Sequence, residues 1–389
     1  MRIQLKHFLR PARSLRVIRQ RAAQRAELRQ LIRIGRQRFA VDPRYRMDSV
    51  EQGFAPRSQN SDDDTADDNA LLQRICNAYS KAMERQPAAP ETFQANRWWR
   101  LVEGGNLGPV KRALAAHDLA SLRLMYRNFF RDRCGAGLVG LPGIGNAFSR
   151  YKELFLIDAL HRIDLWGRRT SGRFPLADLE TPDIGNPLGV VMGDIRVRTG
   201  SEDQHFYARK IIDLTVSAVT PVVAEIGGGF GGMAYFLLRD RPGLTYLDFD
   251  VPESVALASW YLLKAFPHLK ATLYGEALLT AETLKSSGII LMPGFMLPHM
   301  PDRGVDVSFN SHVLSDMSPA SIHQYLAEIV RTTRHSILHV NGGESCRAIS
   351  AWLAGNATDF ALVDQQRAEW NAARSLHPNE TECLYTRNQ

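Results

Sequence analysis

Cysteine is scarce in this 389-residue sequence, and the spacing of the few present argues against several kinds of site. Cys76, Cys134, Cys346 and Cys383 form no C-x-x-C pair and no zinc-ligand pattern. We therefore expect no disulfide framework and interpret these side chains as packing residues in a reducing compartment. No Asp, Glu or His cluster has metal-ligand spacing either, so no metal site is predicted.

Long apolar runs are also missing. No stretch approaches the roughly eighteen consecutive apolar residues of a membrane span, and the N-terminus lacks the uninterrupted apolar region of a signal peptide. Apolar residues still make up 44% of the chain, which is enough for a sizeable core, and the length suffices for two compact units. We predict a cytoplasmic protein.

The net positive charge of the protein is concentrated at one end of the chain. Residues 1–46 hold thirteen arginines and one lysine against Glu27 and Asp42, so this segment carries +12 and the remainder −5. A nucleic-acid enzyme spreads basic residues over its working face, so we expect no nucleic-acid partner. The basic segment predicts amphipathic helices that touch an anionic membrane surface or an acidic partner. A solvated extension and a mitochondrial presequence are the alternatives.

Acidic residues mark the end of this basic extension. The run SDDDTADDN predicts that residues 47–69 form a disordered acidic linker. Residues 70–200 show apolar side chains at three- and four-residue spacing, which indicates helices, and we assign them to a cap that contacts the substrate. A short hairpin is expected around Gly193 and Asp194, and residues 201–389 form the second domain.

This second domain alternates strand and helix patterns, which predicts a mostly parallel sheet covered on both faces. Its last strand-like segments, FALVDQ and ECLYTR, have no room for a crossover helix between them and predict an antiparallel hairpin. Methyltransferase sheets end in this way, whereas an ordinary dinucleotide fold does not. The fold class is therefore α/β, a Rossmann-like seven-stranded methyltransferase sheet with an N-terminal helical domain. The strands expected before the hairpin span residues 222–226, 245–250, 289–292, 305–310 and 336–340.

The stretch AEIGGGFGGMAYF at 224–236 places glycines at the first strand-to-helix turn, where the backbone approaches a ligand. Dinucleotides and S-adenosylmethionine both use such a turn. A dinucleotide would set a doubly negative pyrophosphate there, which a carboxylate at Glu225 opposes. S-adenosylmethionine brings an ammonium and a sulfonium instead, so Glu225 favours it. The predicted cofactor contacts in this stretch are Glu225, Gly227, Gly228, Gly229 and Gly231.

The second strand ends in a carboxylate that predicts nucleoside binding. Asp250 follows Glu225 by twenty-five residues, and a carboxylate there can accept hydrogen bonds from both ribose hydroxyls. Asp248 competes for the same role. This carboxylate would serve either cofactor class.

At this point the sequence resembles a known family. VVAEIGGGFGGMAYFLLRDRPGLTYLDFDVPESVALASWYLLKAF, followed by VDVSFNSHVLSDMS, is similar to the sugar O-methyltransferases, a class I group that depends on S-adenosylmethionine. WWRLVEGGNLGPVKRALAAHDLASLRLMYRNFFRD, Gly137-Leu138 and IGNPLG resemble its N-terminal region, so the resemblance covers residues 95–341. It implies a methyltransferase domain with a helical cap, S-adenosylmethionine as cofactor, and a sugar or glycoside hydroxyl as acceptor.

A more distant similarity connects the sequence to plant-type small-molecule O-methyltransferases, through Asp250-Val251-Pro252, Gly275-Glu276, and His312 with Ser315-Asp316. It implies an adenosine contact for Glu276. This sequence departs from the plant-type pattern at Val313, because in that family an acidic residue follows the histidine. If residues 289–292 form the third strand, Glu276 lies in a loop.

The candidate base is His312, at the carboxyl end of the fourth expected strand. A hydroxyl is a poor nucleophile while protonated, and a positioned base contributes roughly 10²–10⁴-fold. Asp316, four residues later, either orients the imidazole or, like Ser318, caps the next helix. Asn310 is expected to bind cofactor or substrate, or else to form a turn.

Other residues carry weaker expectations. Trp98, Trp99, Tyr126 and Phe129 are candidates for stacking on a sugar, against the alternative of core packing. His205 and Tyr207 are plausible cofactor contacts, and His339 is expected to be a buried, satisfied histidine.

Three hypotheses follow. The first is an S-adenosylmethionine-dependent O-methyltransferase acting on a sugar, glycoside or another small molecule. The second is a nicotinamide-dependent oxidoreductase or epimerase, although no Y-x-x-x-K pair supports the short-chain version. The third is a non-enzymatic scaffold that keeps the fold.

Overall fold

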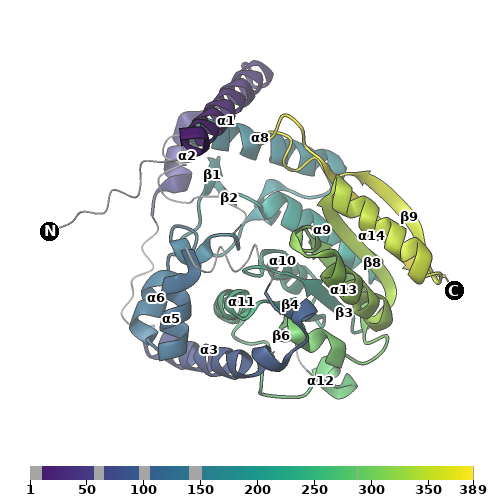
Figure 1. Cartoon of the computed structure of the whole chain (residues 1–389). Coiled ribbons are helices and arrows are strands. Elements are labelled where there is room, and N and C mark those ends of the chain that lie inside the picture. The colour runs from purple at the N-terminus through teal and green to yellow at the C-terminus, as the bar shows by residue number, and fades with distance from the viewer. Residues whose placement is uncertain (1–10, 57–64, 96–105, 140–150, 287, 389) are drawn as a thin grey trace.

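A computed structural model of the chain describes residues 11–56, 65–95, 106–139, 151–286 and 288–388. Figure 1 shows helices packed around a central sheet, with the purple and blue N-terminal helices on one side and the green and yellow C-terminal elements on the other. The trace thus joins the two predicted domains into one packed body.

Eight strands build the central sheet: β3 (Val222–Ile226), β4 (Thr245–Asp250), β5 (Ala271–Leu273), β6 (Ile289–Pro293), β7 (Val305–Ser311), β8 (Thr333–Gly342), β9 (Phe360–Arg367) and β10 (Glu380–Arg387). Their order across the sheet is β5-β6-β4-β3-β7-β8-β10-β9. Neighbours pair in parallel, except that β10 runs antiparallel to both β8 and β9.

This arrangement confirms the predicted Rossmann-like fold. The seven expected strands are present, and the two last ones form the antiparallel hairpin. The sheet also has an eighth strand that was not predicted, because β5 spans only three residues and is too short to show a period. It extends the sheet beyond β6, at the edge opposite β9.

Helices cover both faces of the sheet, as the alternation of strand and helix predicts. On one face lie α9 (Ser201–Leu214), α10 (Gly232–Asp240) and α11 (Pro252–Ala265), and on the other α12 (Ala281–Ser286), α13 (Pro319–Thr332) and α14 (Gly343–Asn356). Successive residues of β3 serve the two layers, since Val223 packs in the first core and Ala224 in the second. Helix α13 begins where Ser318 accepts a hydrogen bond from the Ser321 amide, so Ser318 is its cap.

The N-terminal part is helical, as predicted. Its α-helices are α1 (Pro11–Arg38), α2 (Met47–Phe54), α3 (Thr65–Arg85), α5 (Gly108–Ala116), α6 (Leu119–Tyr126) and α8 (Lys152–Arg169). Short 3₁₀ turns in this part are η2 (Gln86–Ala88), η3 (Glu91–Phe93), η5 (Arg133–Gly135) and η6 (Leu176–Leu179). Two more connect strands of the sheet: η7 (Gly294–His299) follows β6, and η8 (Val313–Asp316) follows β7. The predicted hairpin at Gly193 and Asp194 is confirmed by β1 (Gly189–Met192) and β2 (Ile195–Arg198).

The expectation of a disordered linker over residues 47–69 does not hold at its two ends. Residues 47–54 form α2, and residues 65–69 form the first turn of α3, whereas residues 57–64 lie outside the described part. Asp68 is buried, and its carboxylate lies 2.8 Å from Arg127 Nη2 and 2.5 Å from Lys264 Nζ. Acidic residues near a helix start complement the helix dipole, and Asp67 and Asp68 lie in the first turn of α3.

The basic extension is likewise attached in part. Leu31 and Phe39 are buried, and α1 packs against α8. The Arg36 guanidinium lies 2.5 Å from Glu153. The predicted extension thus contributes buried side chains to the packed helices. Among the described residues, no helix is both long and apolar enough to cross a membrane.

Candidate active site

A cavity of about 220 Å³ opens at the carboxyl ends of the parallel strands. It lies where the strand order reverses, between β4 on one side of β3 and β7 on the other. In open α/β sheets, ligands bind at this switch point. The glycine-rich turn after β3 therefore lies at the switch point, where a ligand-binding turn is expected.

Two of the predicted glycines form the floor of this cavity. Gly227 and Gly229 have φ angles of 81° and 61°, in the left-handed region that side chains rarely adopt. A Cβ on Gly227 would also lie 2.7 Å from the Cβ of Val313. The turn can follow this path only with glycine at both positions.

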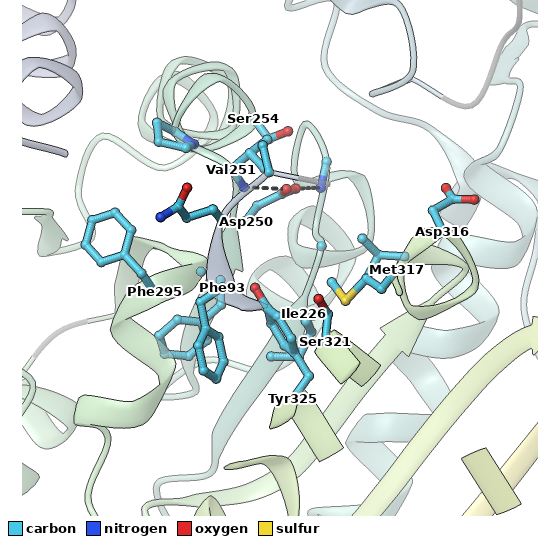
Figure 2. A pocket seen from close by; sticks show the side chains of 18 of the residues that line it. Phe93, Ile226, Asp250, Val251, Ser254, Phe295, Asp316, Met317, Ser321 and Tyr325 are labelled. Carbon is cyan, nitrogen blue, oxygen red and sulfur yellow. Dashed lines mark hydrogen bonds between the residues drawn. The ribbon is translucent and has the colours of Figure 1, made fainter. Parts of the chain in front are cut away.

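Asp250 connects the second strand to that turn. Its carboxylate accepts hydrogen bonds from the Val251 amide at 2.7 Å and from the Gly229 amide at 3.0 Å, drawn as dashed lines in Figure 2. Burial raises the pKa of Asp250 to about 6. The side chain lines the cavity, as predicted for a ribose contact.

Glu225 and Asp248 lie beneath the turn instead of in the cavity. Glu225 accepts a hydrogen bond from the Tyr246 hydroxyl at 2.7 Å, and Asp248 accepts one from the Gly228 amide at 2.9 Å. Both carboxyl groups are buried, which raises the pKa of Glu225 to about 7 and that of Asp248 well above its usual value. Asp248 and Asp250 are two residues apart and so share one face of β4. Asp250 ends the strand and reaches the cavity, whereas Asp248 lies deeper and holds the Gly228 amide of the loop.

Four further predicted cofactor residues do not line this cavity: Gly228, Gly231, Glu276 and Asn310. Asn310 donates to the Ile226 carbonyl at 2.9 Å and so joins β7 to β3. Gly231 directly precedes α10, and a Cβ atom added to it would meet the side chain of Leu262. Glu276 is paired with Arg74 of α3 at 2.7 Å. Its loop follows β5, the outer strand of the sheet.

The sequence analysis missed the apolar wall of the cavity. Figure 2 shows Phe93, Phe295 and Tyr325 gathered on one side, across from Asp316. These side chains come from η3, η7 and α13, which are far apart in the sequence and share no motif. The Gly137-Leu138 pair, noted only for its resemblance, also lines the cavity.

A second cavity of about 250 Å³ adjoins the first and shares Ser311 and His312 with it. Polar side chains from α8 and α9 and from the start of β10 line most of its wall. Two guanidinium groups and two carboxylates face it, so their formal charges balance. The charged lining residues are Arg162, Arg374, Asp203 and Glu380, beside Thr199, Gln204, Tyr207, Trp370 and Asn371.

His312 lies between the two cavities. Its backbone adopts a left-handed conformation with φ of 67°, and its amide donates to the Val340 carbonyl at 2.8 Å. The imidazole Nε2 is 3.6 Å from Oε1 of Glu380, which also accepts a hydrogen bond from the Asn371 amide at 2.6 Å. The sequence analysis did not predict Glu380, because β10 lies seventy residues away and carries no motif.

Asp316, the carboxylate predicted to orient His312, lines the first cavity and not the second. Burial raises its pKa, and the nearby His312 opposes that rise. The helix cap is Ser318, so capping does not occupy Asp316. His312 therefore has carboxylates on both sides.

The aromatic and histidine candidates have mixed outcomes. Trp98 and Trp99 lie outside the described residues, while Tyr126 and Phe129 are buried in the core and do not line either cavity. His205 is buried and accepts a hydrogen bond from the Trp166 indole at 3.0 Å. Tyr207 lines the second cavity. His339 is buried as predicted, but its Nε2 has no hydrogen-bond partner.

No protein-family model matches the chain, and no curated protein does. Parts of solved structures are similar. A magnesium protoporphyrin IX methyltransferase from Synechocystis with bound S-adenosylmethionine is 12% identical, with 50% of this chain and 87% of that chain covered and a TM-score of 0.35. An S-adenosylmethionine-dependent methyltransferase from Aquifex aeolicus is 13% identical, covering 48% and 93% with a TM-score of 0.34. An N-methyltransferase from Bradyrhizobium japonicum in complex with S-adenosyl-L-homocysteine is 10% identical, covering 49% and 88% with a TM-score of 0.34.

Proposed function

We propose that this protein transfers a methyl group from S-adenosylmethionine to a hydroxyl of a sugar or glycoside. The observation that carries the proposal is the position of His312 and Ser311, which line both an acidic cavity at the switch point and a polar cavity beside it. One cavity would hold the cofactor and the other the acceptor. The transfer would take place where they meet.

The charges of the first cavity support S-adenosylmethionine over a dinucleotide. Asp250 and Asp316 line it, and among the described residues no lysine or arginine does. The buried carboxyl groups of Glu225 and Asp248 lie under the turn as well. A pyrophosphate would meet this acidic surface without a cation, whereas a sulfonium and an ammonium are attracted to it.

The residues present fit this cofactor. Asp250 would accept the ribose hydroxyls, and the open backbone at Gly227 and Gly229 leaves room for the amino-acid end. Phe93 and Phe295 supply the apolar surface that an adenine ring needs. When bound, the cofactor supplies an electrophilic methyl group on a sulfonium.

The second cavity supports an uncharged, hydroxyl-rich acceptor. Arg162 is ion-paired with Asp203, and Arg374 donates to Asp158 at 2.6 Å, so these cations are already neutralised by the protein. Amide and hydroxyl groups complete a wall that can both donate and accept hydrogen bonds. A sugar ring matches such a surface, whereas a phosphate would find no unpaired cation there among the described side chains.

His312 is placed to act as the general base. Its imidazole would take the proton of the acceptor hydroxyl as the oxygen attacks the methyl carbon. The Glu380 carboxylate would stabilise the imidazolium that forms and hold the ring in place.

We also infer a cytoplasmic location for the protein, with the arginine-rich N-terminus as a contact to the membrane surface.

Binding and turnover test the proposal separately. Isothermal titration with S-adenosylhomocysteine and with NAD should give binding for the first ligand only; the reverse result would exclude the methyltransferase. Methyl-labelled cofactor is then offered to a panel of neutral glycosides, with uronic acids and sugar phosphates as charged counterparts. We expect the labelled methyl group to appear in neutral glycosides. In the His312→Ala variant, the rate of this transfer should fall by at least about 10²-fold, while the affinity for the cofactor is retained.

A further inference from the structure

Two cysteines that are far apart in the sequence meet in the second core. Cys346 lies in the first turn of α14 and Cys383 in β10, and their sulfur atoms are 3.2 Å apart. Both side chains are buried, with 1% and 0% of their surface exposed. A disulfide needs a sulfur separation of about 2.05 Å, so a small closing movement is enough to form one.

We propose that Cys346 and Cys383 form a disulfide bond when the protein meets hydrogen peroxide, and that this bond joins α14 to β10. The contact polarises the pair. The hydrogen bond from Cys383 lowers the pKa of Cys346, with Ser350 and the Arg347 cation acting in the same direction, and it raises the pKa of Cys383. A helix N-terminus also favours a thiolate. Cys346 is therefore the attacking sulfur and Cys383 the resolving one.

The chemistry balances with peroxide as the oxidant. The Cys346 thiolate attacks one peroxide oxygen, the O–O bond breaks, and the leaving hydroxide takes a proton to become water. The sulfenic acid formed on Cys346 is then attacked by the Cys383 sulfur. An S–S bond forms, the Cys383 proton joins the departing hydroxyl, and a second water leaves. Ser350, which contacts the pair, is partly exposed and marks the side from which a small oxidant enters.

His339 raises the alternative of a metal site. It pairs with Cys383 across the strands, and ligand atoms of the three side chains lie within 4.8 Å of one another. Its hydrogen bonds argue against this role. The side-chain amide nitrogen of Asn310 donates to the Ile226 carbonyl, and its oxygen accepts from the side-chain amide of Asn341. The same Asn341 nitrogen therefore carries hydrogens, and it lies 3.2 Å from His339 Nδ1. Nδ1 is thus an acceptor, Nε2 carries the proton, and no lone pair is left for a metal.

The test uses the full chain and its own cysteines as controls. Native protein is treated with hydrogen peroxide, unfolded, alkylated with N-ethylmaleimide and digested. We expect a linked peptide pair containing Cys346 and Cys383, a mass lower by two hydrogens, a higher Tm than that of the reduced protein, and full alkylation of the buried Cys76 and Cys134. Cys383→Ala should trap a sulfenic acid on Cys346 that reacts with dimedone, and Cys134→Ala should still form the link.

Two results would overturn the proposal. In one, both cysteines stay free to alkylate at peroxide doses that oxidise Cys346 in the Cys383→Ala variant. In the other, the purified chain carries one equivalent of zinc, and its removal by a chelator lowers the Tm. Because the assay reads a covalent link and not turnover, it succeeds or fails independently of the proposed methyl transfer.

Discussion

The imidazole Nε2 of His312 lies 3.6 Å from the Glu380 carboxylate, and the strands that bring these residues together, β7 and β10, run in opposite directions. His312 follows the end of β7, and Glu380 opens β10, so the end of one strand meets the beginning of the other. An antiparallel strand in a parallel sheet is what makes this meeting possible. The relationship identifies a partner for the proposed base that the local motif does not contain.

Glu380→Gln should therefore lower kcat by about 10- to 100-fold, the effect of losing a charge-assisted contact worth about 1.5–3 kcal/mol. Glutamine keeps the shape of the side chain but cannot stabilise an imidazolium. Turnover and the dissociation constant of S-adenosylhomocysteine are measured together, and the latter should not change. Asp316→Asn is the matched control, with a smaller expected loss; the opposite ranking would assign the orienting role to Asp316.

Asp250→Asn should weaken S-adenosylhomocysteine binding by about 10- to 100-fold, because the ribose hydroxyls lose a charged acceptor. Asp248→Asn should bind nearly as well as wild type, since Asp248 lies beneath the turn and does not line the cavity. Wild-type affinity should also fall as the pH drops through about 6, where Asp250 takes up a proton. Titration calorimetry at pH 5 and pH 8 measures both effects. Equal losses in the two variants would contradict the assignment of Asp250.

Glu225→Gln should stabilise the protein at alkaline pH. Burial raises the pKa of Glu225 from 4.5 to about 7, so the native state binds this proton more tightly than the unfolded chain does. Wild-type stability consequently falls as the pH rises from about 4.5 to about 7, by on the order of 3 kcal/mol from this group. The glutamine carbonyl can still accept from Tyr246. Urea unfolding at pH 4.5 and pH 8 should show similar stabilities at the lower pH and a more stable variant at the higher; a constant difference would refute the linkage.

Asp68→Ala should destabilise the protein by roughly 3 kcal/mol, because it removes the buried partner of both Arg127 and Lys264. Asp67 is exposed in the same helical turn and provides the control. Asp67→Ala should cost less than about 0.5 kcal/mol. Chemical unfolding of the wild type and the two variants at one pH measures these differences. Equal stabilities of all three proteins would contradict a stabilising role for the ion pairs of Asp68.

Local patterns predicted most of the fold. The glycine turn, the expected strands and the closing hairpin each depend on residues that are neighbours in the sequence, and period and turn chemistry are visible there. The exception was β5, whose three residues cannot show a period. Glu276, for which the plant-type resemblance implied an adenosine contact, lies in the loop after this strand and pairs with Arg74.

The candidate site was predicted only where one motif supplies it. Asp250 ends a strand, and Gly227, Gly229 and His312 lie in turns directly after strands, where position along the chain fixes position in space. Glu380 and the apolar wall of Phe93 and Tyr325 come from distant segments that only the tertiary fold brings together. No local signal distinguishes a glutamate that reaches such a cavity from one on the surface.

The second cavity takes Trp370, Asn371, Arg374 and Glu380 from the last twenty residues of the chain. During synthesis, the glycine turn and the first strands leave the ribosome well before this stretch is made. The cavity at the glycine turn can therefore begin to form on a nascent chain, while the second cavity stays incomplete until residues 370–380 have been added. A chain that stopped shortly before residue 370 would keep the glycine turn but lack both β10 and one wall of the second cavity, so the loss would affect the sheet and this cavity together.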